Sequence, residues 1–271
     1  MIDQNQDSLA PPEAPISPYS ARTQELIHEL SEAESATDVS AREIADLKER
    51  LADALHADGL ISESMQYLTD SLGTYEDYKD KRAAARLCNK LGSSKFLTNN
   101  YSASVEFFSR QSEWGQQAGN FITVAKGLLN MGIVQLLTAQ TEAAVESTNL
   151  AVSALETCSG EEPFYANLFC FVNHVRGTYF LANAEFDKAK EYHAKVLAAA
   201  ESQPSEEDPL TSVIFQSKTN LGICAVKEGL FKEALEHFQA CKELCETPFL
   251  RAKTLYHIGE FVRGAKRRAA A

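Results

Sequence analysis

The sequence is short of the residues that interrupt helices and of the runs that cross membranes. Of its 271 residues only 13 are glycine and 8 are proline, and four of the prolines lie together at Pro11, Pro12, Pro15 and Pro18. No apolar run approaches the ~20 residues that a membrane-spanning helix needs. The first seven residues are polar and acidic and lack the basic start and apolar stretch of a signal peptide. We therefore expect a cytoplasmic protein without membrane insertion.

Signatures of catalysis and of cofactor binding are also missing. The sequence has no Gly-rich phosphate loop, no Gly-x-Ser-x-Gly elbow and no His-Glu-x-x-His motif, and its six histidines are dispersed. The six cysteines are expected to be free thiols, since no secretory signal precedes them. His237, Cys241 and Cys245 share one helical face, but a single straight helix does not close a tetrahedral zinc site. We expect no enzyme activity, no cofactor and no bound metal.

Positive charge is scarce. The chain carries 38 acidic and 26 basic residues, a net charge of −12 and a pI near 5.0. Because binding to phosphate backbones needs clustered Lys and Arg, this balance argues against a nucleic-acid partner. The basic cluster from Arg263 to Arg268 is interpreted as a solvated tail, with contact to an acidic partner such as a tubulin surface as the alternative.

What the chain does contain is a repeat of small residues. Four glycines are each followed, twelve residues later, by a second small residue; the pairs are Gly92 with Ser104, Gly132 with Ala144, Gly177 with Ala189, and Gly222 with Ala234. Successive glycines are 40, 45 and 45 residues apart, and Ala52 with Ser64 upstream and Gly259 downstream extend the register. A period in this range indicates stacked helix hairpins rather than one closed globule.

Residues 218–241 form the clearest unit. Phe231, Ala234, Leu235 and Phe238 follow helical spacing, and Gly229 is a helix terminator just before them. This unit resembles the tetratricopeptide repeat (TPR). The resemblance implies that Leu221 and Gly222 lie where the two helices touch, that Gly229 closes the first helix, and that the second helix packs through Phe231, Ala234, Phe238 and Cys241.

The other units carry the pattern less completely, and the resemblance spans residues 41–265. The unit of Gly132 is the weakest, because Thr148 stands where an aromatic residue is expected. The common repeat has about 34 residues, and we predict that the extra length here falls between hairpins, in Glu113–Asn120, Ser153–Pro163 and Glu201–Leu210. Longer repeats of this kind resemble those of GoLoco-binding spindle adaptors, rapsyn, axonemal TPR proteins and bacterial peptide-sensing regulators, all of which are binders.

The predicted fold is all-α: a right-handed TPR-like superhelical solenoid of about five helix hairpins plus a C-terminal capping helix. We predict three segments, namely a disordered acidic and Pro-rich tail over residues 1–21, the repeat domain over 22–265 and a short basic tail over 266–271. From Thr23, the apolar residues Leu26, Ile27 and Leu30 predict a short helix that caps the solenoid or lies along its groove.

In TPR stacks the first helix of each hairpin lines the concave surface, so the predicted partner site uses first-helix residues. A basic end beside an apolar stretch suits a partner with acidic residues and an apolar anchor. Asn130 and Asn220 occupy a slot in which related adaptors hold a peptide backbone, the alternative being that they simply face solvent. The predicted partner-binding residues are Arg86, Asn89, Lys90, Lys126, Leu129, Asn130, Ile133, Phe171, His174, Asn220 and Lys253.

These features predict a scaffold or adaptor that holds a protein or peptide partner in its concave groove. By resemblance, the setting is a cytoskeletal complex, axonemal or spindle, with a place at the cytoskeleton or in a cilium or flagellum. A peptide-sensing regulator is the alternative. A chaperone-binding carboxylate clamp is disfavoured, because Phe171 and Val175 stand where its last two charges belong.

Overall fold

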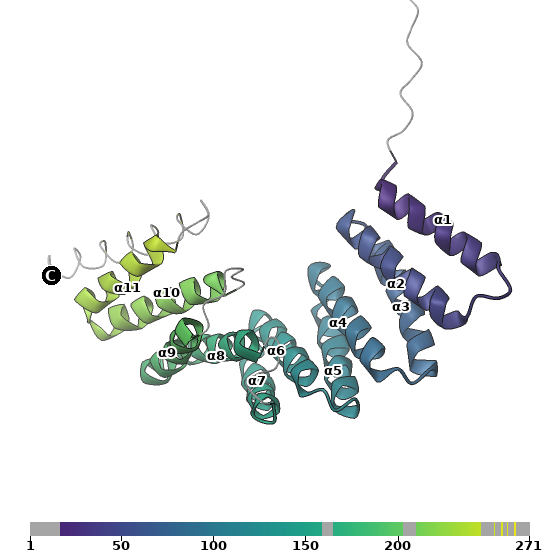
Figure 1. Cartoon of the computed structure of the whole chain (residues 1–271). Helices are drawn as coiled ribbons and strands as arrows, with labels where there is room; N and C mark the ends of the chain where they lie inside the picture. The colour runs from purple at the N-terminus through teal and green to yellow at the C-terminus, as the bar shows by residue number, and fades with distance from the viewer. Residues whose placement is uncertain are drawn as a thin grey trace, which may run out of the picture. The chain divides into compact units, whose positions relative to one another are not determined.

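The computed structural model describes residues 17–158, 165–202 and 210–244, with the single positions Ala252, Tyr256, Gly259 and Arg263. Over this part of the chain the regular structure is entirely helical, as predicted, and comprises eleven α-helices (Figure 1). The chain divides into two compact units, Met1–Tyr78 and Lys79–Ala271, which are described separately.

The first unit contains α1 (Ala21–Ser35), α2 (Ala41–Ala57) and α3 (Ile61–Asp77). The predicted short N-terminal helix is α1, and it packs on α2 through a buried cluster of four leucines: Leu26, Leu30, Leu51 and Leu55. Its start is fixed by the carboxylate of Asp58, which accepts hydrogen bonds from the Ser20 N–H at 2.9 Å and the Thr23 hydroxyl at 2.7 Å. These hydrogen bonds lower the pKa of Asp58.

The described part of the second unit contains four antiparallel hairpins. They pair α4 (Lys81–Leu97) with α5 (Tyr101–Gln117), α6 (Phe121–Leu137) with α7 (Thr141–Glu156), α8 (Tyr165–Ala182) with α9 (Phe186–Ser202), and α10 (Thr211–Glu228) with α11 (Phe231–Glu243). Successive hairpins also touch, since α5 packs on α6, α7 on α8 and α9 on α10. The chain is thus an all-α TPR-like solenoid with five hairpins, counting α2–α3. The predicted C-terminal capping helix lies largely outside the described residues.

One turn conformation recurs along the chain. The middle residue of each tight turn has a positive φ near 60–80°, and these residues are Gly59, Lys79, Asn99, Gly119, Ala139, Ala184 and Gly229. After the middle residue, the next N–H reaches back to the last turn of the preceding helix, for example from Asn100 to the Lys95 carbonyl at 2.8 Å and from Gln140 to the Gln135 carbonyl at 2.8 Å. This is the Schellman pattern of helix ends. The prediction that Gly229 closes α10 is confirmed.

The extra repeat length lies in two of the three predicted places, near Ser153–Pro163 and Glu201–Leu210, but not at Glu113–Asn120. Glu113–Gln117 is not a linker but the last part of α5, and only three residues separate α5 from α6. From α2 to α6, helices of 17 residues alternate with such short turns, which accounts for the 40-residue interval. Only the 45-residue intervals contain longer connections, over residues 157–164 and 203–210.

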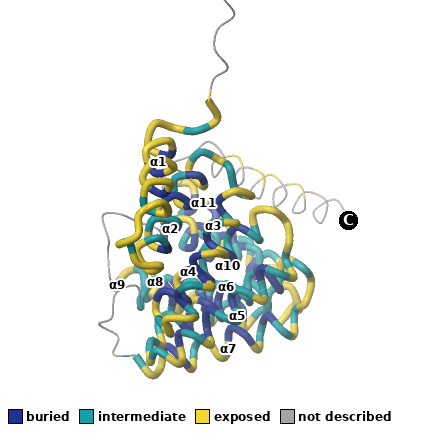
Figure 2. Tube along the Cα trace, turned by 90° about the vertical axis from the view of Figure 1, so that its right-hand side faces the viewer, coloured by how far each residue is buried: buried dark blue, intermediate teal, exposed yellow. Residues whose placement is uncertain are grey.

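The small-residue pairs lie where the helices of a hairpin cross. A methyl group added at Gly92 would stand 2.6 Å from the Phe108 ring, and one at Gly222 would stand 2.6 Å from the Phe238 ring. In the same place Gly132 meets Thr148 and Gly177 meets His193. Buried positions recur along one side of each helix (dark blue in Figure 2). Close backbone approach therefore requires glycine at these crossings, and the side chain beneath it varies.

Candidate partner-binding surface on the first helices

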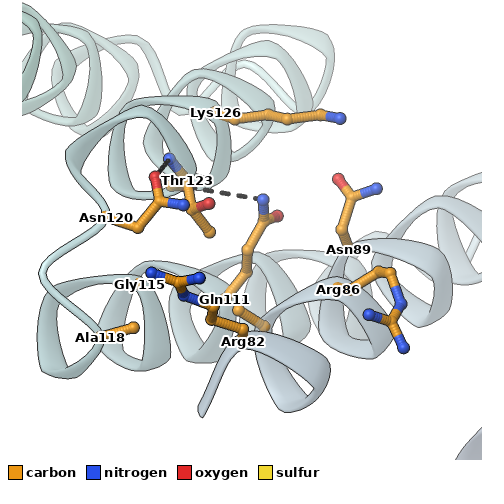
Figure 3. Close-up of a pocket in the computed structure, with 10 residues that line it drawn as sticks. Arg82, Arg86, Asn89, Gln111, Gly115, Ala118, Asn120, Thr123 and Lys126 are labelled. Carbon is orange, nitrogen blue, oxygen red and sulfur yellow. Dashed lines mark hydrogen bonds between the residues drawn. The ribbon is translucent and has the colours of Figure 1, made fainter. Parts of the chain in front are cut away.

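A pocket of about 230 Å³ opens between α4, α5 and the start of α6. Figure 3 shows the side chains that line it, with Asn89 and Arg86 on α4, Gln111 on α5 and Thr123 and Lys126 on α6. Arg82, Ala85, Gly115, Ala118 and Asn120 complete the lining. The Asn120 side chain caps α6 by accepting a hydrogen bond from the Thr123 N–H at 3.0 Å. The lining contains three cationic side chains and no carboxylate.

The structure brings together part of the predicted site. Arg86, Asn89 and Lys126 line this one pocket, and Asn130 lies beside them because its side-chain N–H₂ donates to the Asn89 carbonyl oxygen at 3.3 Å. Lys90 is half-buried on α4. Of the predicted basic end, Arg86 and Lys126 thus lie around one pocket on neighbouring first helices of the second unit, whereas Lys90 is not among the lining residues.

The predicted apolar stretch is only partly accessible to a partner. Leu129 is only 3% exposed and belongs to the core cluster formed with Val124, Leu155 and Val172. It lies on the inner side of α6, where a partner has no access to it, so the prediction that Leu129 belongs to the binding surface was wrong. Ile133 and Phe171 are partly buried against the same core and keep some exposed surface.

His174 and Asn220 are both half-buried and lie together in a hydrogen-bond network around the buried His193. The Ser217 hydroxyl is 3.0 Å from Nδ1 of His174 and 3.3 Å from Nδ1 of His193. The Asn220 amide nitrogen is 3.3 Å from the Thr178 hydroxyl and 3.2 Å from Nε2 of His193. Burial, with a smaller contribution from His174, lowers the pKa of His193 to about 3. The ring at 193 is thus neutral and ties α8, α9 and α10 together.

The remaining predicted residue, Lys253, lies outside the described residues. Seven of the ten lining residues were missed from the sequence, four of them with polar or charged side chains: Arg82, Gln111, Asn120 and Thr123. The repeat register held one signal for Gln111, because 40 residues before and after it the equivalent helix positions are the small buried residues Ser71 and Ala151. A large polar side chain in a slot otherwise filled by small ones marks a departure from plain packing.

A second hollow lies between α5, α6 and α7. It has a volume of about 480 Å³ and an apolar lining that includes Phe121, Val124, Leu128, Met131 and Leu150. Phe121 and Leu150 are exposed. This hollow is the alternative place for a partner to contact the second unit.

In the described ranges no group of three or more His, Cys, Asp or Glu side chains is placed to hold a metal ion. Cys241 is buried beside the Phe215 carbonyl and the Thr219 hydroxyl, His237 pairs with Glu233, and Cys245 falls outside these ranges. Burial raises the pKa of Cys170 to about 11, which keeps its thiol protonated and unreactive. None of the helices seen here is both long and apolar enough to span a bilayer.

Comparison with known proteins identifies the fold. No protein-family model matches the sequence, and a search of curated proteins finds no match. Among solved structures, BtubC (BKLC) from P. vanneervenii is similar with a TM-score of 0.66 at 15% identity, covering 82% of this chain and 89% of that one. The apo form of the quorum sensor NprR from B. thuringiensis has a TM-score of 0.65 at 10% identity, covering 87% of this chain and 64% of that one.

A third similar structure is YrrB, titled a TPR protein with an unusual peptide-binding site. Its TM-score is 0.51 at 12% identity, and the match covers 86% of this chain and 99% of that one. At identities this low the likeness establishes the fold and not the activity. Together with the hairpin geometry and the glycine register, it shows that the chain has the fold of TPR proteins.

Proposed function

We propose that this protein is a non-enzymatic scaffold or adaptor that holds a protein or peptide partner on the first-helix surface of its second unit. The observation that carries the proposal is the cluster of Arg86, Asn89 and Lys126 around one pocket. In a chain of net charge −12, such a cluster attracts acidic segments and speeds their association.

The partner's chemistry follows from the surface. Its acidic residues pair with Arg86 and Lys126, while Ile133 and Phe171 offer the apolar area that remains after Leu129 is assigned to the core. The Asn89 and Asn130 amides lie between these parts and carry hydrogen-bonding groups for a peptide backbone. The net charge of −12 argues against a nucleic-acid partner, and none of the described helices is long and apolar enough for membrane insertion.

We place this function in the cytoplasm, within a cytoskeletal complex such as an axonemal or spindle assembly. The support is the resemblance of the long repeats to those of spindle and axonemal adaptors. One similar solved structure is titled a putative kinesin light chain with TPR-like repeats, with a TM-score of 0.55 at 15% identity.

A peptide-sensing regulator is the second candidate. The pocket favours it, because a cavity of about 230 Å³ holds one or two side chains rather than a folded domain. The likeness to the quorum sensor NprR and to YrrB, with its peptide-binding site, agrees with this alternative. The two candidates differ in ligand size: an adaptor retains a long or folded partner, whereas a sensor binds a short peptide alone.

The test is affinity capture with matched variants. The bait is the wild type, the double variant Arg86→Glu with Lys126→Glu, or the control Lys227→Glu with Lys232→Glu, which makes the same charge change at exposed positions outside the pocket. A partner that binds the wild type and the control but not the pocket variant supports the proposal. Equal capture by all three folded baits overturns it and points to the apolar hollow beside Phe121.

Kinetics with the captured partner refine the test. Charge reversal at Arg86 and Lys126 should slow association and reduce its salt dependence, since steering by charge is screened by salt. Surface plasmon resonance at two salt concentrations measures both effects. Binding of a synthetic peptide from the partner, as tight as that of the whole partner, decides for the sensor.

A further inference from the structure

The pocket between α4, α5 and α6 has a composition that its surroundings do not predict. Acidic residues outnumber basic ones by 38 to 26 in the chain, yet Arg82, Arg86 and Lys126 line the pocket and no Asp or Glu does. Like charges around one cavity repel each other, and that repulsion is relieved when an anion enters. The pocket is therefore suited to a negatively charged group.

Two of these cations have no partner of their own. Throughout the described residues, no hydrogen bond or ion pair is formed by the Arg82 guanidinium or the Lys126 ammonium. Both side chains are exposed, so they can turn toward a ligand without disturbing the core. By contrast, Lys188, Lys190 and Lys195 elsewhere in the unit are each paired with a carboxylate.

Gln111 adds a second requirement. Its side chain is 2% exposed, and its Oε1 atom is buried without a hydrogen-bond donor. The amide nitrogen is directed to the Thr123 carbonyl oxygen at 3.5 Å, and Figure 3 shows the amide between Thr123 and Asn89. A buried acceptor without a donor is costly. A ligand that brings an N–H group next to its anionic group satisfies both the cations and this oxygen.

We propose that the pocket binds a phosphorylated side chain of an extended peptide, with the phosphate on Arg82, Arg86 and Lys126 and a neighbouring peptide N–H on Gln111 Oε1. This inference rests on the proposed function, because it names the group by which the partner docks. A phosphate monoester carries close to two negative charges and three acceptor oxygens, so it matches three cations better than a carboxylate does. The ester has no N–H to donate, so the peptide supplies the donor for Gln111.

The size of the cavity agrees with this assignment. A volume of about 230 Å³ corresponds to several water molecules, at roughly 30 Å³ each in the liquid. That is room for a phosphate together with the adjoining peptide group. The Asn120 side chain is already used to cap α6, and the side-chain oxygen of Asn89 accepts a hydrogen bond from Asn130. The proposal assigns recognition to the three cations and Gln111.

The test uses small capped probes and the full chain. N-acetyl-phosphoserine N-methylamide, its glutamate and serine counterparts, and inorganic phosphate are each titrated while NMR follows the side-chain signals of Gln111, Arg82 and Lys126. We expect the phosphoserine probe to bind at least tenfold more tightly than the glutamate probe and than inorganic phosphate, and to shift the Gln111 amide signals.

Variants locate the binding. Arg82→Gln with Lys126→Gln should weaken the phosphoserine probe at least tenfold, while Lys227→Gln with Lys232→Gln, an equal loss of charge outside the pocket, should leave it unchanged. Gln111→Met should remove the preference for the phosphoserine probe over inorganic phosphate. Glutamate or serine probes that bind as tightly, or an unchanged affinity in the pocket variant, overturn the inference. If affinity capture still depends on Arg86 and Lys126, only the phosphate assignment fails and the proposed function stands.

Discussion

Two junctions between neighbouring first helices contain polar residues at equivalent positions, but these residues have different surroundings. We define the α4–α6 junction by Asn89 and Asn130 and the α8–α10 junction by His174, Thr178, Ser217 and Asn220. At the first, one hydrogen bond joins the two helices beside an open, basic pocket. At the second, Ser217 and Asn220 both lie within hydrogen-bonding distance of the buried His193 of α9.

The repeat register makes the comparison direct. Asn130 and Asn220 each lie two residues before a hairpin glycine, and Asn89 and His174 each lie three residues before one. Equivalent positions therefore lie beside an open pocket in one junction and in the hydrogen-bond network around His193 in the other. The difference comes from the neighbouring second helix, which places the Phe108 ring under Gly92 but the polar His193 ring under Gly177. A polar residue at a groove position is thus no guide to binding until its second-helix neighbour is known.

The largest expected effect tests whether the hairpins behind the two junctions are equivalent. Phe108→Ala and Phe238→Ala each remove a buried ring packed against a hairpin glycine. Each should lower the free energy of unfolding by about 3–5 kcal/mol. Urea denaturation followed by circular dichroism measures both. A ring that can be removed without loss would show that the register assigned to its hairpin is wrong.

Acid should break the α8–α10 junction selectively. The pKa of His193 is about 3 in the folded protein and about 6.5 in the unfolded chain, so the unfolded state binds the extra proton between these values. The stability from neutral His193 is complete above pH 6.5 and declines as the pH falls toward 3. At pH 4.5 the loss should be about 2–3 kcal/mol.

The matched control is His193→Phe. It places a phenyl ring under Gly177, as Phe108 does under Gly92 and Phe238 under Gly222. Denaturation curves at pH 7.5 and pH 4.5 should show a smaller acid loss for the variant than for the wild type, because the histidine proton is gone while the carboxylates are unchanged. Equal losses would mean that His193 is not held neutral in the folded state.

A pair of equivalent substitutions sharpens the contrast further. Asn220→Ala removes the donor near Nε2 of His193 and the Thr178 hydroxyl, and should destabilise by about 1–3 kcal/mol. Asn130→Ala removes one bond at a half-exposed site and should cost less than about 0.5 kcal/mol. Thermal melts of the two variants compare these losses of stability directly. A larger loss for Asn130→Ala than for Asn220→Ala would contradict the different roles assigned to the two junctions.

The turns should respond alike in both regions, and here the substitutions should stabilise the protein. Ala139 and Ala184 adopt φ of 58° and 59°, a conformation that strains any residue with a Cβ. Replacing either by glycine should stabilise the protein by about 0.5–1 kcal/mol, since the relief of strain exceeds the added chain entropy. Gly119→Ala is the inverse control. Unfolding midpoints that move in the same direction for all three would refute the assigned turn geometry.

Sequence periodicity was sufficient for the fold because glycines and small residues are needed wherever two helices touch. The hairpin register around Gly92 and Gly222 follows from that requirement, and so does the end of α10 at Gly229. One predicted linker was wrong. The polar composition of Glu113–Gln117 suggested a connection between hairpins, although this segment continues α5. Polar composition does not distinguish an exposed helix end from a loop.

The site was predictable only in its charges. Arg86 and Lys126 were found because basic residues stand out against an acidic chain, but the burial of Leu129 depends on α7 and α8 packing against it. Gln111 and Arg82 were missed because they come from a second helix and from the first turn of α4. Which helix ends converge on a cavity is a property of the stack and not of one helix's periodicity.

The regular spacing of the turns restricts which insertions and deletions the repeat can accept. Residues with positive φ stand at 59, 79, 99, 119 and 139, so each step of 20 residues ends one helix and reverses the chain. Removing 40 residues between two such turns deletes a whole hairpin and leaves every later side chain facing the way it did before. Removing any other number rotates the downstream helices out of phase. From α2 to α6, the gene for such a chain can therefore grow or shrink by duplication only in steps of one hairpin if the later side chains are to keep their places.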